Sequence, residues 1–158
     1  MIRQIGVFGL TEWIVTASLR GFSVDDWWER PGGANPAIWI TGHILAHRRI
    51  LAGLLGLPVE PSGNDRHFAR GTSPDDVPAG LDGRALLKEF RAFHKTFVES
   101  LEAMDPAALD EPIDVDFPNV PKTRLGALQF LCMHESYHAG QLGQLRVVLG
   151  KGSWMRGG

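Results

Sequence analysis

The segment that decides the fold runs from Thr123 to Leu149 and reads TRLGALQFLCMHESYHAGQLGQLRVVL. Apolar residues recur in it at three- and four-residue steps, which is the period of one helix face. Thr123 opens this predicted helix and Gly150 closes it. The residues that share its inward face are Leu131, His134, His138, Leu142, Leu145 and Leu149. The pattern therefore predicts a long helix whose buried face carries two histidines.

Three further segments are predicted to be helical: Ile2–Gly21, Ala37–Leu55 and Leu81–Met104. In the second of them, Asn35 is expected to cap the helix and Pro36 to occupy its first position. The apolar residues expected to face the core are Phe8, Trp13, Ile14 and Leu19 in the first helix and Leu86, Phe90, Phe93, Phe97 and Leu101 in the third.

The segments between the predicted helices contain little regular secondary structure. Residues 59–80 are rich in Pro, Gly, Ser and Asp, and they form the longest irregular segment. We find no internal repeat and no alternating strand pattern of useful length. The sequence therefore predicts an all-α fold, a four-helix up-down bundle with a long connection between helices two and three, as a single domain over residues 1–158.

The composition excludes several classes of protein. The chain is 44% hydrophobic and 22% charged with a formal net charge of −2, so it offers no electrostatic case for binding nucleic acid. It has no polybasic run, and no window approaches the roughly 18 apolar residues of a membrane span, so we expect no membrane association. No sorting signal is visible, and the expected compartment is the cytoplasm.

The single cysteine, Cys132, rules out an intrachain disulfide and a Cys-rich zinc site. It lies in the apolar run 130–133, which favours a buried small hydrophobe over a nucleophile. The chain has five tryptophans, and Trp27, Trp28 and Trp39 are expected to anchor the core or an interface.

Four of the six histidines form two pairs at a spacing of four residues, His43/His47 and His134/His138. Residues four apart lie on one helix face, and both pairs fall within an apolar stripe, which in the second helix also contains Ile40, Ile50 and Leu54. Several imidazoles buried together without partners are costly. A divalent metal satisfies them at once, so the pattern predicts a metal site in the bundle core.

Residues 134–138 also match H-E-x-x-H, the zincin metalloprotease signature, with Glu135 as general base. Zincins take their third ligand downstream, and residues 139–158 contain no His, Asp or Glu. The metzincin extension fails too, because Gln141 and Gln144 stand where Gly and His are required. The third ligand must therefore come from upstream, with His43 or His47 as its source.

Two motifs resemble those of the DinB-like family. Residues 35–43, NPAIWITGH, are similar to the second-helix motif of that family, and His134-x-x-x-His138-x-Gly140-Gln141 is similar to its last-helix motif. The resemblance implies a four-helix bundle with three histidine ligands and open coordination positions. Carried over residue by residue, the ligands are His43, His134 and His138, and the expected metal is Zn or Ni.

The remaining site residues have more open roles. His47 has no obligatory counterpart in the family pattern. We expect it to support the ligands through a hydrogen bond without contacting the metal, with a fourth ligand or a plain core residue as alternatives. Gln141 could bond a metal-bound water, and Gly140 either permits close helix approach or is incidental. Glu135 lies about 100° around the helix from His134, which favours an outward direction. Glu135 and Gln141 are the weak catalytic candidates.

The resemblance also implies a range of functions. Characterised relatives in the wider group include metal-dependent thiol S-transferases, which use thiols such as bacillithiol or mycothiol, and a maleylpyruvate isomerase. We therefore expect a metal-dependent transferase acting on small molecules. The alternative is a non-enzymatic metal-binding or stress-response protein. A metal-dependent hydrolase or isomerase ranks third. Arg48, Arg49, Arg124 and Arg146 could receive carboxylates of a thiol, although solvated surface is their expected place. The family resemblance and the tryptophans further suggest a homodimer.

Overall fold

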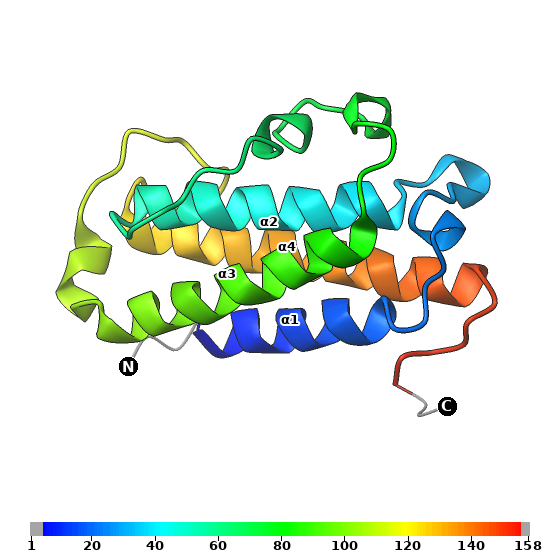
Figure 1. Cartoon of the computed structure of the whole chain (residues 1–158). Coiled ribbons are helices and arrows are strands. Elements are labelled where there is room, and N and C mark those ends of the chain that lie inside the picture. Colours follow the sequence, from blue (N-terminus) through cyan, green and yellow to red (C-terminus); the bar gives the residue numbers. More distant parts are fainter. Residues whose placement is uncertain (1–4, 156–158) are drawn as a thin grey trace.

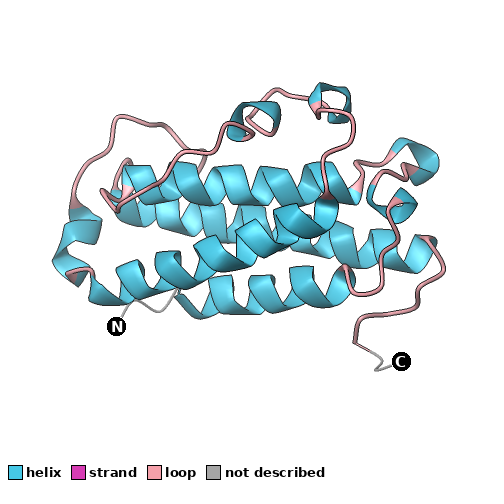
Figure 2. Ribbon diagram, in the orientation of Figure 1, coloured by secondary structure: helices cyan, strands magenta, loops and turns pink. Residues whose placement is uncertain are grey.

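The computed structural model describes residues 5–155, which form four long helices (Figures 1 and 2). They are α1 (Ile5–Ser18), α2 (Ala37–Leu54), α3 (Gly83–Ala103) and α4 (Arg124–Val148). Within the described range there is no strand, only an isolated antiparallel bridge between Pro112 and Thr123. The predicted all-α class is confirmed, and residues 2–4 of the first predicted helix lie outside the described residues.

The four helices form a closed ring in the order α1, α4, α2, α3, so that α1 and α2 lie diagonally across the bundle. The N-terminal half of α2 packs with the N-terminal half of α3, and the two C-terminal halves pack together. Because the long connection spans the whole bundle, α3 runs in the same direction as α2 (Figure 1). The order is therefore up-down-down-up rather than strictly alternating.

Local capping sets three of the helix ends. Thr123 Oγ1 accepts a hydrogen bond from the Gly126 amide at 3.3 Å, and Asp82 Oδ1 accepts one from Arg84 at 2.9 Å. Gly150, with φ of 73°, follows α4 in the left-handed conformation. The expected cap at Asn35 was wrong: Pro36 holds the N-cap position of α2, and no side chain bonds the free amides there.

The core consists of two hydrophobic clusters that follow each other along the bundle, with Phe93 packed against both. The stripe predicted for α3 is confirmed at Leu86, Phe90, Phe97 and Leu101, which are buried. Two predicted core residues are exposed instead, Trp13 by 54% and Ile50 by 47%. Trp13 packs edge-on against Trp154, with ring centroids 5.0 Å apart, on the outside of α1. Trp154 thereby ties the C-terminal segment to the bundle.

The connection between α2 and α3 crosses over α2 with two short 3₁₀ turns, η3 (Asp65–His67) and η4 (Pro74–Asp76) (Figure 1). Phe68, directly after η3, is buried. A Cβ atom at Gly42 would lie 2.4 Å from its Cε1, so the ring occupies space that only a glycine leaves on α2. This contact pins the connection to the helix that supplies His43.

Among the described residues, no helix combines the length and apolar character needed to cross a membrane.

Candidate metal centre

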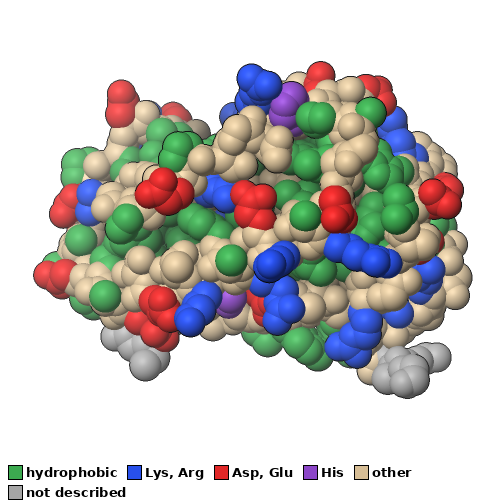
Figure 3. All heavy atoms as spheres, viewed as in Figure 1, with side chains coloured by type: hydrophobic (Ala, Val, Ile, Leu, Met, Phe, Trp, Pro, Cys, Tyr) green, Lys and Arg blue, Asp and Glu red, His purple; other side chains and the backbone are tan. Residues whose placement is uncertain are grey.

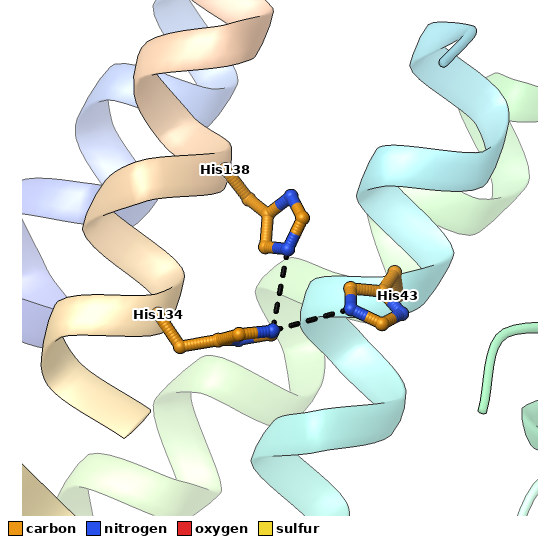
Figure 4. A group of neighbouring side chains, drawn as sticks. All are labelled: His43, His134 and His138. Atoms are coloured by element: carbon orange, nitrogen blue, oxygen red, sulfur yellow. Dashed lines mark hydrogen bonds between the residues drawn. The ribbon is translucent and has the colours of Figure 1, made fainter. Parts of the chain in front are cut away.

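The rings of His43, His134 and His138 point toward one another across the gap between α2 and α4 (Figure 4). One ring nitrogen from each lies within 4.8 Å of the others. The Nε2 atom of His134 is 3.2 Å from His43 Nε2 and 3.2 Å from His138 Nε2. The structure thus brings the three predicted ligands together, and we call them the histidine cluster. That they bind a metal stays a prediction.

The outer nitrogens of two rings fix where the protons lie. His43 Nδ1 donates to the Phe68 carbonyl at 2.7 Å, and His138 Nδ1 donates to Gln141 Oε1 at 2.7 Å. A neutral imidazole carries one proton, so both Nε2 atoms present a lone pair to the centre. His134 Nε2 has at most one proton to offer to the two of them. A divalent cation would accept all three lone pairs, so the donor set fits one.

The electrostatics favour the neutral state that a metal ligand needs. Burial, together with the neighbouring His47, lowers the pKa of His43 to about 3. Burial and the same neighbour lower the pKa of His134 to about 3. Burial also lowers the pKa of His138. The three rings are therefore in their neutral form at neutral pH and available as ligands.

Aromatic side chains pack nearly parallel to the rings of His43 and His134 and restrict the orientation of these rings. Trp39, one turn before His43, stacks on it with centroids 4.4 Å apart and planes within 16°. Phe130 lies one turn before His134, nearly parallel to it, at 6.2 Å. Trp39 and Trp27 are buried, as expected of core anchors, and Trp28 is partly buried.

His47 lies beside the histidine cluster but outside it. Its Nδ1 donates to the backbone carbonyl of His43 at 2.9 Å, and its ring is 4.1 Å from that of His43 and 4.6 Å from that of His134. Its nitrogens do not belong to the group of converging ligand atoms. The supporting role expected for His47 agrees with this position and stays a prediction.

Gln141 is hydrogen-bonded to one of the ligand rings. Its Oε1 holds His138 Nδ1, while its Nε2 donates to the Tyr137 hydroxyl at 3.1 Å. Both ends of the amide are therefore engaged within α4, and the bond to a metal-bound water expected from the sequence stays a prediction. The residue fixes the orientation and tautomer of His138.

Glu135 was expected to point outward, and this expectation is wrong: its side chain points inward and is only 3% exposed. Its Oε2 accepts from Arg48 Nε at 2.7 Å, and its Oε1 accepts from the same guanidinium and from the Thr11 hydroxyl. Arg48, expected at the surface, is 1% exposed and also donates to His94 Nδ1 at 2.8 Å. We call Thr11, Arg48, His94 and Glu135, one residue from each helix, the Arg48 cluster. The carboxylate that a protease would need as general base is occupied there.

The other three arginines are also engaged internally. Arg49 pairs with Asp65 at 2.6 Å and Glu89 at 2.7 Å, and Arg124 pairs with Glu111 at 2.9 Å. Arg146 donates to the carbonyls of Ser18 and Arg20. The expected surface place is wrong for Arg49, which is buried.

Gly140 does not permit a close approach of another helix, since no atom lies within 4 Å of where its Cβ would be. Of the two expected roles, an incidental small residue fits this position.

Sequence reasoning missed three residues that build the centre: Gly42, Phe68 and Gln141 as the partner of a ligand. A glycine in a helix interior, directly before a histidine, is a signal for close packing. Phe68 is a lone aromatic residue within a polar connection, which is a signal for an anchor. Neither signal shows that Gly42 and Phe68 contact each other, because the two residues are 26 positions apart in the sequence.

A search of curated proteins finds no match to this chain. A comparison with known families matches the DinB superfamily over residues 14–142, which spans α2, α3, the last five residues of α1 and most of α4. The match includes every residue of the histidine cluster and of the long connection, and members of this superfamily bind metals. With a bundle of four helices and a three-histidine group that could hold a metal ion, the chain belongs to the DinB superfamily.

Proposed function

We propose that this protein is a divalent-metal-dependent transferase that joins a low-molecular-weight thiol to an electrophilic carbon. The observation that carries the proposal is the three-histidine group, which includes no fourth His, Cys, Asp or Glu among the described residues. Structural zinc sites usually close with four protein ligands, whereas catalytic sites keep a position open. Zinc or nickel is the expected ion, because neutral imidazole suits both.

His43, His134 and His138 would hold the cation, and Gln141 and the Phe68 carbonyl would orient two of these rings. A bound divalent cation supplies Lewis acidity, which lowers the pKa of a coordinated thiol. The chain's own thiol does not serve as the nucleophile. Cys132 is buried, and burial raises its pKa to about 12, so it stays protonated at neutral pH. The reacting sulfur would therefore come from a small-molecule substrate.

A cavity of about 470 Å³ lies beside the centre, and its size suits a small ligand. Ile40, Leu145 and Val148 give it an apolar wall, and Asn35, Gln141 and Gln144 add side-chain amides. Gln141 connects this cavity to His138. Because the lining carries no charged residue, it favours a neutral, hydrogen-bonding thiol over one held by its carboxylates. Arg48, Arg49, Arg124 and Arg146 are already engaged by other groups of the protein, which supports the same conclusion.

The test begins with metal analysis of the untagged protein, followed by chelation and reloading with Zn, Ni or Co. Thiol binding to the Co(II) form should produce a thiolate-to-metal charge-transfer band. Loaded protein should then accelerate the reaction of bacillithiol, mycothiol or cysteine with monobromobimane, and His138→Ala should abolish both signals. His67→Ala, a histidine of η3 outside the cluster, is the matched control and should retain both. A charge-transfer band without any acceleration would argue against transferase activity.

One observation favours the alternative, a non-enzymatic metal-binding or stress-response protein. The only carboxylate next to a ligand in sequence, Glu135, is bound to Arg48 and Thr11 and is not available to move a proton. Tight metal binding combined with no thiol ligation to Co(II) would select this alternative.

A further inference from the structure

A second concave site lies on the side of the bundle away from the histidine cluster, between α1 and α3. It is a groove of about 590 Å³. Four cationic side chains line it, Arg84, Lys88, Arg91 and Lys95, at positions i, i+4, i+7 and i+11 of α3. Viewed from this side, Lys and Arg side chains gather along α3 (Figure 3).

The groove has one negative charge to balance these four. Glu12 of α1 lies 3.3 Å from Arg91 Nε and accepts a hydrogen bond from Thr16. Within the described residues, Lys88 and Lys95 have no ion-pair partner. Like charges three and four residues apart on a helix repel one another. An anion in the groove would relieve this repulsion.

His94 adds a directed donor to the same groove. Its Nδ1 accepts from Arg48, which can only donate, so its proton lies on Nε2. The buried guanidinium thus fixes the tautomer of a histidine that lines the groove. The fold therefore fixes which ring nitrogen of His94 carries the proton and can donate a hydrogen bond.

We propose that this groove binds a small dianionic molecule, a phosphate ester or a dicarboxylate, through Lys88, Lys95 and His94. Its volume falls in the range of small-molecule sites, and Leu87 and Ala92 offer an apolar wall to the rest of the ligand. A net charge of −2 over the whole chain argues against an extended nucleic acid as the occupant.

The experiment titrates phenyl phosphate and, separately, phthalate into the zinc-loaded protein and follows amide and imidazole signals by ¹H–¹⁵N NMR. Saturable shifts along α3 and at the His94 side chain are expected with at least one probe, and the probe that binds identifies the head group. Lys88→Gln/Lys95→Gln should weaken binding at least about 10-fold. Arg20→Gln/Lys122→Gln removes the same total charge elsewhere and should leave the affinity unchanged within about two-fold.

Three outcomes would overturn the proposal. The first is no saturable shift with either probe. The second is equal weakening in both double variants, which indicates a nonspecific charge effect. The third is binding that ignores the Lys88→Gln/Lys95→Gln change but disappears with the metal, which places the probe at the histidine cluster.

Discussion

Two buried polar clusters lie side by side in this bundle, and they differ in whether the protein completes them. Arg48 and Glu135 directly follow His47 and His134 in sequence, so they lie about 100° further around α2 and α4. In the Arg48 cluster, donors meet acceptors: each guanidinium nitrogen has a partner, and both carboxylate oxygens are bonded. In the histidine cluster, three Nε2 atoms face one another with at most one proton between them.

The two clusters thus differ in their hydrogen bonds: the protein supplies every partner in the Arg48 cluster but leaves lone pairs without donors in the histidine cluster. A buried ion pair with all partners present stabilises the arrangement of the four helices that meet in it. A buried set of lone pairs without a donor is costly until a cation joins it. The Arg48 cluster should therefore control stability, and the histidine cluster should control metal affinity.

The largest expected effect is on stability. Arg48→Ala leaves the Glu135 charge buried without its cationic partner, which should lower the free energy of unfolding by about 3–5 kcal/mol. Urea denaturation of metal-free protein measures it. His138→Ala in the same metal-free background should cost distinctly less. Equal losses for the two variants would erase the distinction between the clusters.

The next effect is on metal affinity. His43→Ala, His134→Ala and His138→Ala should each weaken binding by on the order of 1,000-fold, because three ligands share a binding free energy of more than about 10 kcal/mol. His47→Ala should lose less, about 10–100-fold. Competition with a chromophoric chelator gives the affinities. A loss for His47 as large as that for His43 would make His47 the ligand from α2.

A smaller loss is expected from residues that only orient the ligands. Gly42→Ala places a Cβ against Phe68, whose carbonyl holds His43, and should weaken metal binding by about 10–100-fold. Gly53→Ala is the control in the same helix, where nothing lies within 4 Å of the new Cβ. It should keep the affinity and stabilise α2 by up to about 1 kcal/mol. Equal affinities for the two variants would mean that Phe68 does not position His43.

The smallest effect concerns an ion pair that water reaches. Lys151 lies 2.8 Å from Asp26, and this contact is the main cause that lowers the Asp26 pKa from 3.8 to about 2. A depressed carboxyl pKa contributes stability above its unfolded value, and the contribution is lost as pH falls from about 4 through about 2. Asp26→Asn should therefore be slightly less stable than wild type at pH 7, and the difference should shrink below pH 4. Thermal unfolding between pH 2 and 7 measures it; a constant difference would contradict the assignment.

Much of the centre could be predicted because its ligands belong to two regular helices. His134 and His138 share a face by spacing alone, and the apolar residues around them show that this face is inward. The direction of Glu135 could not be obtained in this way. An acidic residue is expected outside unless it has a buried partner, and that partner is 87 residues earlier in the chain.

The sequence by itself determined the four helices, the all-α class and the histidines on inward faces, because these follow from helical periodicity and from local stop signals. Only the tertiary structure decided that α3 runs parallel to α2, that Arg48 and Glu135 form a buried pair, and that the Phe68 carbonyl sets the tautomer of His43. The physical reason is distance along the chain. Periodicity reports which face of a helix is buried, but a hydrogen bond between residues far apart in sequence exists only after the helices have packed.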